Sequence, residues 1–593
     1  MTRPPTTPAH IGVFSKLRRI DVRRCRRVTL PFLLLSILAQ FSATLHATDF
    51  EHLRPTAFQG ITPGVTTLKQ LRAKFDDRVR RKNSNWHIDV GAPFRSVVAR
   101  ESDKRVASIH AELITPWPLK KTMSELGLST PIPPLRTESG GKGRQHWFFP
   151  ERGLKLYASA TPKQHVQAIT LVPLESDELL ARFTAGESVE NELQLLESLQ
   201  RRGFLDQAGK LRLIEWHLRA GHAGDAEVLL TELKLDDGFH RQLLRARHRL
   251  WTGEPTRLER LHIPQLKTQP LLTASRQLSW ARVFATPQVA ELDRAAKLIT
   301  DAIDQLNQHK PSQAALADRL RLEANLVLLQ VIATGDRDDK LERLELSLDN
   351  TELLLEQMVS PAEDPLYKLQ AIRRVLEALV NVEQKVSYQR WQFLAKAAVE
   401  QAAERVDGPL RRSELALERS RIHRQLAGLA RGHGDVTAAT HHAKISLRLL
   451  DDVEHDFCHV RQQIERTETL FLLGVLQAIE MNDHVAAAQW YKQAAEHLTL
   501  IDAESYVPGK IADRWISMGV SYWTIGQKTV ALELTERGKR RIDRFVKSGR
   551  LPASALITCF QNLSTMHGVL GNETQSGEYL RWSRVVGESS RTR

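Results

Sequence analysis

A glycine-rich loop is the first place where residue types and spacing suggest chemistry. Residues Ser139–Arg144 read Ser-Gly-Gly-Lys-Gly-Arg. Backbone amides in such a loop can cradle an anion. The loop lacks the spacing and the closing Lys-Ser/Thr pair of a nucleotide-binding P-loop, however. A solvent loop between two strands is therefore the favoured interpretation.

Histidines gather at two further places. His217 and His222 lie near one expected hairpin, and His433, His441 and His442 lie near another. Neither set includes a carboxylate at the helical spacing that zinc hydrolases use. We therefore interpret them as ordinary packing and surface histidines.

An acidic run with one histidine, Asp451–Asp456, is a candidate for a divalent-cation site. It lacks the glycine and the ordered oxygen ligands of a calcium loop, so a solvated connector is favoured. The chain shows no nucleophile-elbow serine, no Cys-x2-Cys pair and no dinucleotide glycine fingerprint. The sequence thus predicts no catalytic, cofactor or metal residues, and no enzyme.

The positive charge of the chain is concentrated at its beginning. The formal net charge is +14, and residues 1–47 hold eight basic residues against Asp21, which gives +7 there. The remaining +7 is spread over a long chain, and this favours a solvated surface over a phosphate-binding footprint. Nucleic acid is therefore not an expected partner.

Residues 1–47 have the form of a secretory signal peptide. A basic stretch ending at Arg26-Arg27 precedes an apolar run of 14 residues, Val28–Phe41, and Leu45-His46-Ala47 is a plausible cleavage site. A spanning helix needs about 20 apolar residues, so cleavage is favoured over a retained signal anchor. We expect an exported protein, periplasmic or extracellular, with no stable membrane span after cleavage.

Four segments near the C-terminus repeat one pattern. The clearest copy is Trp515-x2-Met518-Gly519-x2-Tyr522-x3-Gly526-x4-Ala531-x6-Gly538. The turn positions of the four copies, Gly434, Asn482, Gly526 and Gly571, are 48, 44 and 45 residues apart. A fixed period of this size predicts stacked helical hairpins, in which small residues let the paired helices approach closely. The copy around Gly474 has one extra residue in its turn.

This pattern resembles the tetratricopeptide repeat (TPR) family, with Thr535 at a position where an aromatic residue is usual. The period near 45 is longer than the family's typical spacing. The resemblance implies an α-solenoid with a groove for a peptide or protein partner. We expect TPR-like repeats over residues 406–593 and degenerate helical-hairpin repeats over 176–405. Amphipathic stretches at 314–332 and 367–380 support helices in the second range.

Residues 48–175 have a different pattern, with strand-like alternation broken by turns. Val106 and Ile109 align with Val166 and Ile169 at an offset of 60, and each set follows a short amphipathic helix. We predict an α+β domain built by duplication of a helix-plus-three-strand unit, with a hairpin turn at 101–104.

The run Gly60–Leu68, leading into a short helix and three strands, resembles the BamE lipoprotein and the β-lactamase-inhibitory proteins. That resemblance covers residues 50–175 and implies a protein-recognition surface on an antiparallel sheet in an envelope protein. A generic α+β domain is the alternative.

Three functions are compatible with these features. The favoured one is an exported, non-enzymatic scaffold that binds a peptide or protein partner, which the sequence does not identify, in a solenoid groove. The first alternative is an envelope enzyme or enzyme regulator with a site between the α+β domain and the solenoid. The second is a cytoplasmic signalling scaffold. The oligomeric state is undetermined.

Overall fold

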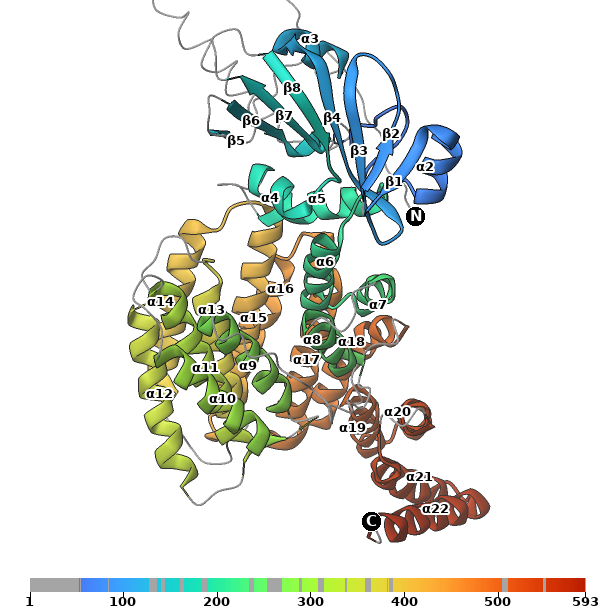
Figure 1. The fold of residues 1–593 in the computed structure, drawn as a ribbon. Helices are drawn as coiled ribbons and strands as arrows, with labels where there is room; N and C mark the ends of the chain where they lie inside the picture. The colour runs from blue at the N-terminus through green and yellow to red at the C-terminus, as the bar shows by residue number, and fades with distance from the viewer. Residues whose placement is uncertain are drawn as a thin grey trace, which may run out of the picture.

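The structure is a computed structural model. It describes residues 53 and 55–591 except 84, 127–135, 140–143, 160–164, 184–188, 234–238, 253–268, 287–288, 290, 308–313, 336–338, 358–363, 381, 383–387, 504–509 and 548–550. The predicted leader, 1–47, lies outside the described residues. An antiparallel sheet domain is followed by helices to the end of the described chain (Figure 1).

The N-terminal domain is one eight-stranded sheet made of two halves. The first half is α2 (Leu68–Phe75), β1 (Val79–Lys82), β2 (Asn85–Ile88), β3 (Phe94–Ser102) and β4 (Arg105–Pro118). The second half is α3 (Leu119–Glu125), β5 (Arg136–Ser139), β6 (Arg144–Phe149), β7 (Leu154–Ser159) and β8 (His165–Leu171). Each half contains one short strand, β1 or β5, in addition to the three that the sequence predicts.

The strand order β1-β2-β3-β4-β8-β7-β6-β5 joins the halves through their last strands. Ile109 pairs with Leu171, and Ala111 pairs with Ile169. The offset of 60 residues relates Ile109 to Ile169 and Ala111 to Leu171, so it converts one pair into the other. The two duplicated halves are therefore related by an approximate two-fold axis in the sheet. The turn between β3 and β4 places Asp103 and Lys104 at positive φ, as a two-residue hairpin turn requires.

Two helices, α4 (Ser176–Phe183) and α5 (Val189–Arg201), lie between the sheet and the remaining helices (Figure 1). Leu53 and Leu174, which flank the sheet domain in sequence, share a buried cluster with Leu179 and Leu180 of α4. The sheet domain is therefore packed against the start of the helical region.

The helical region is a series of antiparallel hairpins, with α8 (Phe239–Thr252) standing between the first and the second. The hairpins are α6 (Gln207–Ala220) with α7 (Ala223–Glu232), α9 (Pro270–Phe284) with α10 (Leu292–Asn307), α11 (Ala314–Thr334) with α12 (Lys340–Gln357), α13 (Tyr367–Val380) with α14 (Gln389–Arg405), α15 (Pro409–Gly432) with α16 (Val436–Asp451), α17 (His459–Val475) with α18 (His484–Ala503), α19 (Lys510–Thr524) with α20 (Lys528–Lys547), and α21 (Ile557–Val569) with α22 (Glu573–Arg591). This is the TPR-like solenoid that the repeat pattern predicts.

The four predicted turn positions all adopt left-handed backbone dihedrals. Gly434, Asn482, Gly526 and Gly571 have φ of 81°, 52°, 82° and 79°. Glycine and asparagine take this conformation more easily than other residues, and for this reason they end the first helix of each hairpin.

Small residues on the paired helices permit a close approach. A Cβ atom on Gly474 would lie 2.2 Å from the ring of Tyr491 in α18, and one on Gly519 would lie 2.4 Å from the Thr535 hydroxyl in α20. Thr535, which stands where TPRs usually have an aromatic residue, is fully buried at this contact. The threonine thus belongs to the close packing of the hairpin.

The extra residue in the turn after Gly474 is absorbed by the helix itself. Leu476–Glu480 form a π-helical turn, in which the Met481 amide donates to the Leu476 carbonyl. A π turn accommodates one residue more than an α turn, so Asn482 still ends the helix in the left-handed conformation.

The helices from α6 to α18, which form six hairpins and the single helix α8, curl into a ring. The α6–α7 turn meets the segment before α17, where a ring nitrogen of His222 donates to the Phe457 carbonyl at 2.9 Å. Arg219 of α6 forms an ion pair with Glu414 of α15 at 2.9 Å. Helices about 200 residues apart in sequence are therefore in contact. The hairpins α19–α20 and α21–α22 extend away from this ring (Figure 1).

Two further findings concern the cysteines and membrane-spanning helices. Cys458 and Cys559 are buried free thiols. Within the described part of the chain, no helix is both long enough and apolar enough to cross a membrane.

Candidate functional site

A cavity of about 1020 Å³ lies at the centre of the ring. Its walls come from α6, α8, α9, α11, α13, α15 and the start of α17, with one residue each from α4 and α5. The second helices of the hairpins, α7, α10, α12, α14 and α16, contribute none of its lining residues. The cavity is thus the concave inner face of the solenoid, closed by the contact of α6 with α15 and α17.

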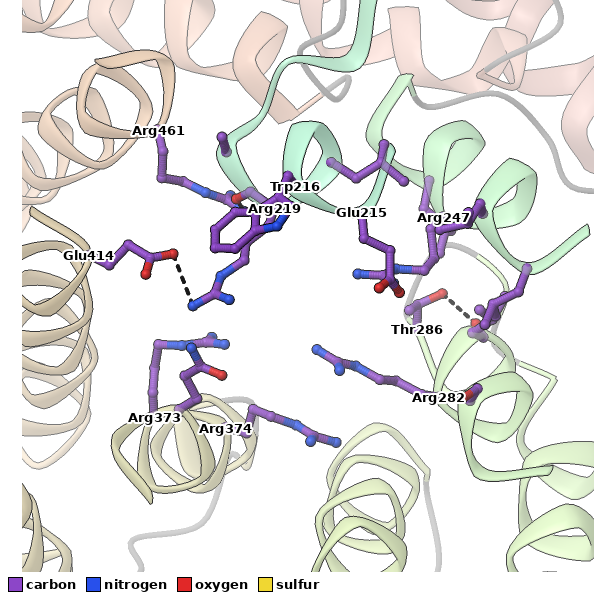
Figure 2. A pocket seen from close by; sticks show the side chains of 18 of the residues that line it. Glu215, Trp216, Arg219, Arg247, Arg282, Thr286, Arg373, Arg374, Glu414 and Arg461 are labelled. Atoms are coloured by element: carbon purple, nitrogen blue, oxygen red, sulfur yellow. Dashed lines mark hydrogen bonds and ion pairs between the residues drawn. The ribbon is translucent and has the colours of Figure 1, made fainter. Parts of the chain in front are cut away.

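Arginine dominates the polar lining. Eight arginines face the cavity, together with six carboxylates: Arg212, Arg219, Arg247, Arg282, Arg373, Arg374, Arg421 and Arg461, with Asp177, Glu192, Glu215, Glu377, Glu414 and Glu418. Figure 2 shows Arg219, Arg282, Arg373 and Arg374 pointing from three helices toward the middle of the cavity.

Several of these arginines are held by ion pairs between neighbouring first helices. Arg373 of α13 contacts Glu418 of α15 at 2.9 Å, and Arg374 contacts Glu323 of α11 at 2.7 Å. Burial alone would raise the pKa of Glu323, but Arg374 and Arg282 outweigh it and hold this pKa at about 2. The carboxylate is therefore charged at neutral pH and fixes the position of Arg374.

Arg282 on α9 has no comparable partner. Its side chain projects into the cavity enclosed by the ring (Figure 2). Among the described residues, no hydrogen bond or ion pair reaches it, and the Glu323 carboxylate acts on it only through its charge. The nearby charge of Arg374, followed by burial, lowers the pKa of Arg282 to about 9. A guanidinium whose pKa falls this far stands in a strongly positive environment, which an anion would relieve.

Arg461 lies on the opposite wall of the cavity. Burial and then Arg421 lower its pKa to about 9. It donates a hydrogen bond to the Arg219 carbonyl at 3.1 Å, which orients it at the junction that closes the ring. The eight arginines outnumber the six carboxylates among the lining residues that the structure describes, so this lining carries a net positive charge.

An apolar surface accompanies the charges. Trp216 and Phe457 line the cavity beside Leu243, Val283 and Leu417. The Arg219 guanidinium lies 5.2 Å from the centre of the Trp216 ring. A lining with planar cations, apolar side chains and a few carboxylates suits a ligand that has both acidic and apolar groups.

The residues singled out from the sequence lie elsewhere. The glycine-rich stretch lies between β5 and β6 in the sequence, and residues 140–143 are outside the described residues. Residues 452–455 connect α16 to the 3-10 turn before α17, and Asp451 is paired with Arg466 at 2.7 Å. The acidic run is thus a connector, in agreement with the favoured interpretation.

The histidine sets lie at different places. His442 is buried with its Nδ1 atom 3.1 Å from Nδ1 of His423, and burial lowers the pKa of both. His217 and His222 come together at the α6–α7 turn. Asp225, whose spacing from them gave no sign of a shared site, lies beside both.

Sequence reasoning did not find the arginine-lined cavity, although one signal was available. Arg373 and Glu418 are 45 residues apart, and Arg514 and Glu468 are 46 apart, close to the repeat period. Opposite charges one period apart lie on adjacent first helices of a solenoid. The net charge of the chain does not reveal this pattern, because it adds all charges together regardless of the helix face on which each residue lies.

Together, the hairpins, the concave cavity and the sheet domain define a TPR-like α-solenoid with an N-terminal antiparallel α+β domain. No family model and no curated protein sequence matches the chain. Among solved structures, it is similar to a signal transduction ATPase with a tetratricopeptide repeat sensor from Pyrococcus horikoshii, at 14% identity and a TM-score of 0.35, over 73% of this chain and 58% of that one.

It is also similar to a Rap protein solved in complex with competence and sporulation factor. The identity is 12% and the TM-score 0.32, over 65% of this chain and 99% of that one. A third similar structure is BtubC from P. vanneervenii, at 15% identity and a TM-score of 0.31, over 46% of this chain and 92% of that one. At TM-scores this low the likeness carries no functional argument, and the assignment as a solenoid stands on the packing of the hairpins.

Proposed function

We propose that this protein is a non-enzymatic interaction scaffold that binds an acidic segment of a partner protein in the central cavity. The observation that carries the proposal is Arg282, a cavity-facing guanidinium in a positive environment next to Arg374. Guanidinium groups bind carboxylates in a planar, two-pronged geometry. The carboxylates of the partner would supply the charge that the cavity lacks.

The size and lining of the cavity favour a protein segment as the ligand. A volume of about 1020 Å³ is at the upper end of the range for small-molecule pockets and too small for a folded domain. Trp216, Phe457 and the leucines of the wall offer apolar contacts that a simple inorganic anion would not use. An extended segment with alternating acidic and apolar side chains matches both parts of the lining.

A library of random short peptides, selected on the purified protein, tests this proposal. We expect the bound peptides to be enriched in Asp and Glu, and Arg282→Gln to weaken their binding at least tenfold, because a charge-assisted hydrogen bond contributes about 1.5–3 kcal/mol. The binding should also weaken with added salt.

The matched control is Arg412→Gln, which removes an exposed arginine of α15 that does not line the cavity. This variant should bind the selected peptides like the unmodified protein. Selection of peptides without acidic enrichment, or equal binding by the Arg282 and Arg412 variants, would contradict the proposal. Tight competition by inorganic phosphate alone would assign the cavity to a small anion instead.

We further propose that the protein is exported and that residues 1–47 are removed. The support is the basic, apolar and small-residue order of the leader, together with the resemblance of residues 50–175 to envelope domains. N-terminal sequencing of the protein isolated from its cells should give a chain that begins at Thr48. A retained Met1 would rule out cleavage and favour an anchored or cytoplasmic scaffold.

A further inference from the structure

We propose that His217, His222 and Asp225 bind a divalent transition-metal ion at the α6–α7 turn. His217 is in the last turn of α6, His222 is the residue before α7, and Asp225 is in the first turn of α7. Their ligand atoms all lie within 4.8 Å of one another. This site is on α6 but outside the central cavity, and it does not depend on the proposed function.

The geometry is close to that of a metal site. Oδ2 of Asp225 is 3.6 Å from Nδ1 of His222 and 4.0 Å from Nδ1 of His217. Metal–ligand bonds of about 2.0–2.2 Å in a tetrahedral site place ligand atoms roughly 3.3–3.6 Å apart. Small side-chain rotations are therefore enough to bring the three atoms around one ion.

The tautomer of His222 is fixed by its environment. Its Nε2 atom is 2.9 Å from the Phe457 carbonyl, which can only accept, so Nε2 carries the hydrogen. In the neutral ring Nδ1 then has a free lone pair, which faces the Asp225 carboxylate. Metal-binding histidines commonly donate their other ring nitrogen to a backbone carbonyl in this way. Phe457 also stacks on the His222 ring with a centroid distance of 5.0 Å.

His217 supplies the second, independent observation. Its side chain is only 9% exposed, and within the described part of the chain its Nδ1 atom has no hydrogen-bond partner. A simple ion pair between His222 and Asp225 would leave this buried nitrogen unsatisfied, whereas a bound cation would satisfy it.

The ligand types indicate which ion is suited. Two imidazole nitrogens and one carboxylate favour zinc and similar first-row divalent ions over calcium or magnesium, which prefer oxygen ligands. Asp225 is 65% exposed, so water can complete the coordination.

The test uses Zn²⁺ and Co²⁺ as probes with the full chain. We expect calorimetry to detect one zinc ion bound per chain, and Co²⁺ to give the visible absorption of a nitrogen- and oxygen-bound ion. Asp225→Asn should weaken zinc binding at least tenfold and abolish the Co²⁺ band. Because Asp225 is exposed, this variant should fold normally, which circular dichroism can verify.

The matched control is Glu227→Gln, which removes an exposed carboxylate two residues away on the same helix. This control matters because the chain has 22 histidines that offer weak sites. The control should bind zinc like the unmodified protein, and His222→Gln should lose binding as Asp225→Asn does. No zinc binding, or equal affinity in the Asp225 and Glu227 variants, would overturn the proposal.

Discussion

Replacing Glu465 with alanine is expected to destabilise the helical ring by about 3–5 kcal/mol, the usual cost of leaving buried charges without their partner. Glu465 on α17 is 3% exposed and contacts Arg421 at 2.9 Å and Arg424 at 3.0 Å. Burial alone would raise its pKa, but Arg424, Arg421 and Arg461 outweigh burial and hold it at about 2. The alanine variant would remove this buried carboxylate from the partly buried Arg421 and Arg424, and Arg421 would keep only its ion pair with Glu418.

Urea unfolding followed by circular dichroism measures this loss. The control is Glu468→Ala on the same helix, because Glu468 forms a more exposed pair with Arg514 at 3.0 Å and should cost about 1 kcal/mol or less. Equal losses in the two variants would contradict the predicted role of the buried network.

The effect of Glu465 should also depend on pH. Its folded pKa lies below the ordinary value of 4.5, so its stabilisation is complete above about pH 4.5 and is lost as the pH falls toward 2. The difference in stability between the unmodified protein and the alanine variant should therefore shrink over that acidic range.

Replacing Trp515 with alanine is expected to destabilise the C-terminal hairpins by about 3–5 kcal/mol, the usual cost of a large cavity in a core. Trp515 on α19 is 1% exposed and belongs to the cluster that includes Tyr491, Leu498 and Met518. The Arg537 guanidinium also lies 4.2 Å from the centre of its ring. These contacts fill the space between successive hairpins. The Trp515 indole is therefore part of the core and is closed to ligands.

The same unfolding measurement applies, with Trp523→Ala as the control. Trp523 is on the same helix but only partly buried, and its loss should cost about 1 kcal/mol. If Trp515→Ala left stability unchanged and instead abolished peptide binding, the residue would belong to a ligand site and the packing interpretation would be wrong.

Much of the fold was accessible from the sequence because it depends on local conformation and on periodic spacing. Gly434, Asn482, Gly526 and Gly571 end helices through their own backbone preferences, which act wherever the hairpin lies. The offset of 60 residues between Ile109 and Ile169 revealed the duplicated sheet for a similar reason: equivalent strands repeat equivalent side-chain patterns. The short strands β1 and β5 were missed because their sequences, Val-Arg-Arg-Lys and Arg-Thr-Glu-Ser, show no alternation of apolar and polar residues.

The candidate site depends on contacts that no spacing encodes. The solenoid curvature brings Arg219 to Glu414 and His222 to Phe457, across about 200 residues of chain. Each hairpin is rotated slightly relative to the one before it, and the sum of these rotations decides whether the array stays open or closes into a ring. The size of each rotation is set by the packing of whole helices against one another. The same closure collects arginines from α6, α9, α13, α15 and α17 around one cavity.

The sequence by itself determined the class of architecture, since helix ends, hairpin spacing and strand alternation follow from short-range backbone and side-chain preferences. Only the tertiary structure decided that the array closes into a ring, that Arg282 and Arg374 face each other inside it, and that Asp225 joins two histidines at its edge. These arrangements depend on distances between residues far apart in the chain, which are fixed by packing rather than by local sequence.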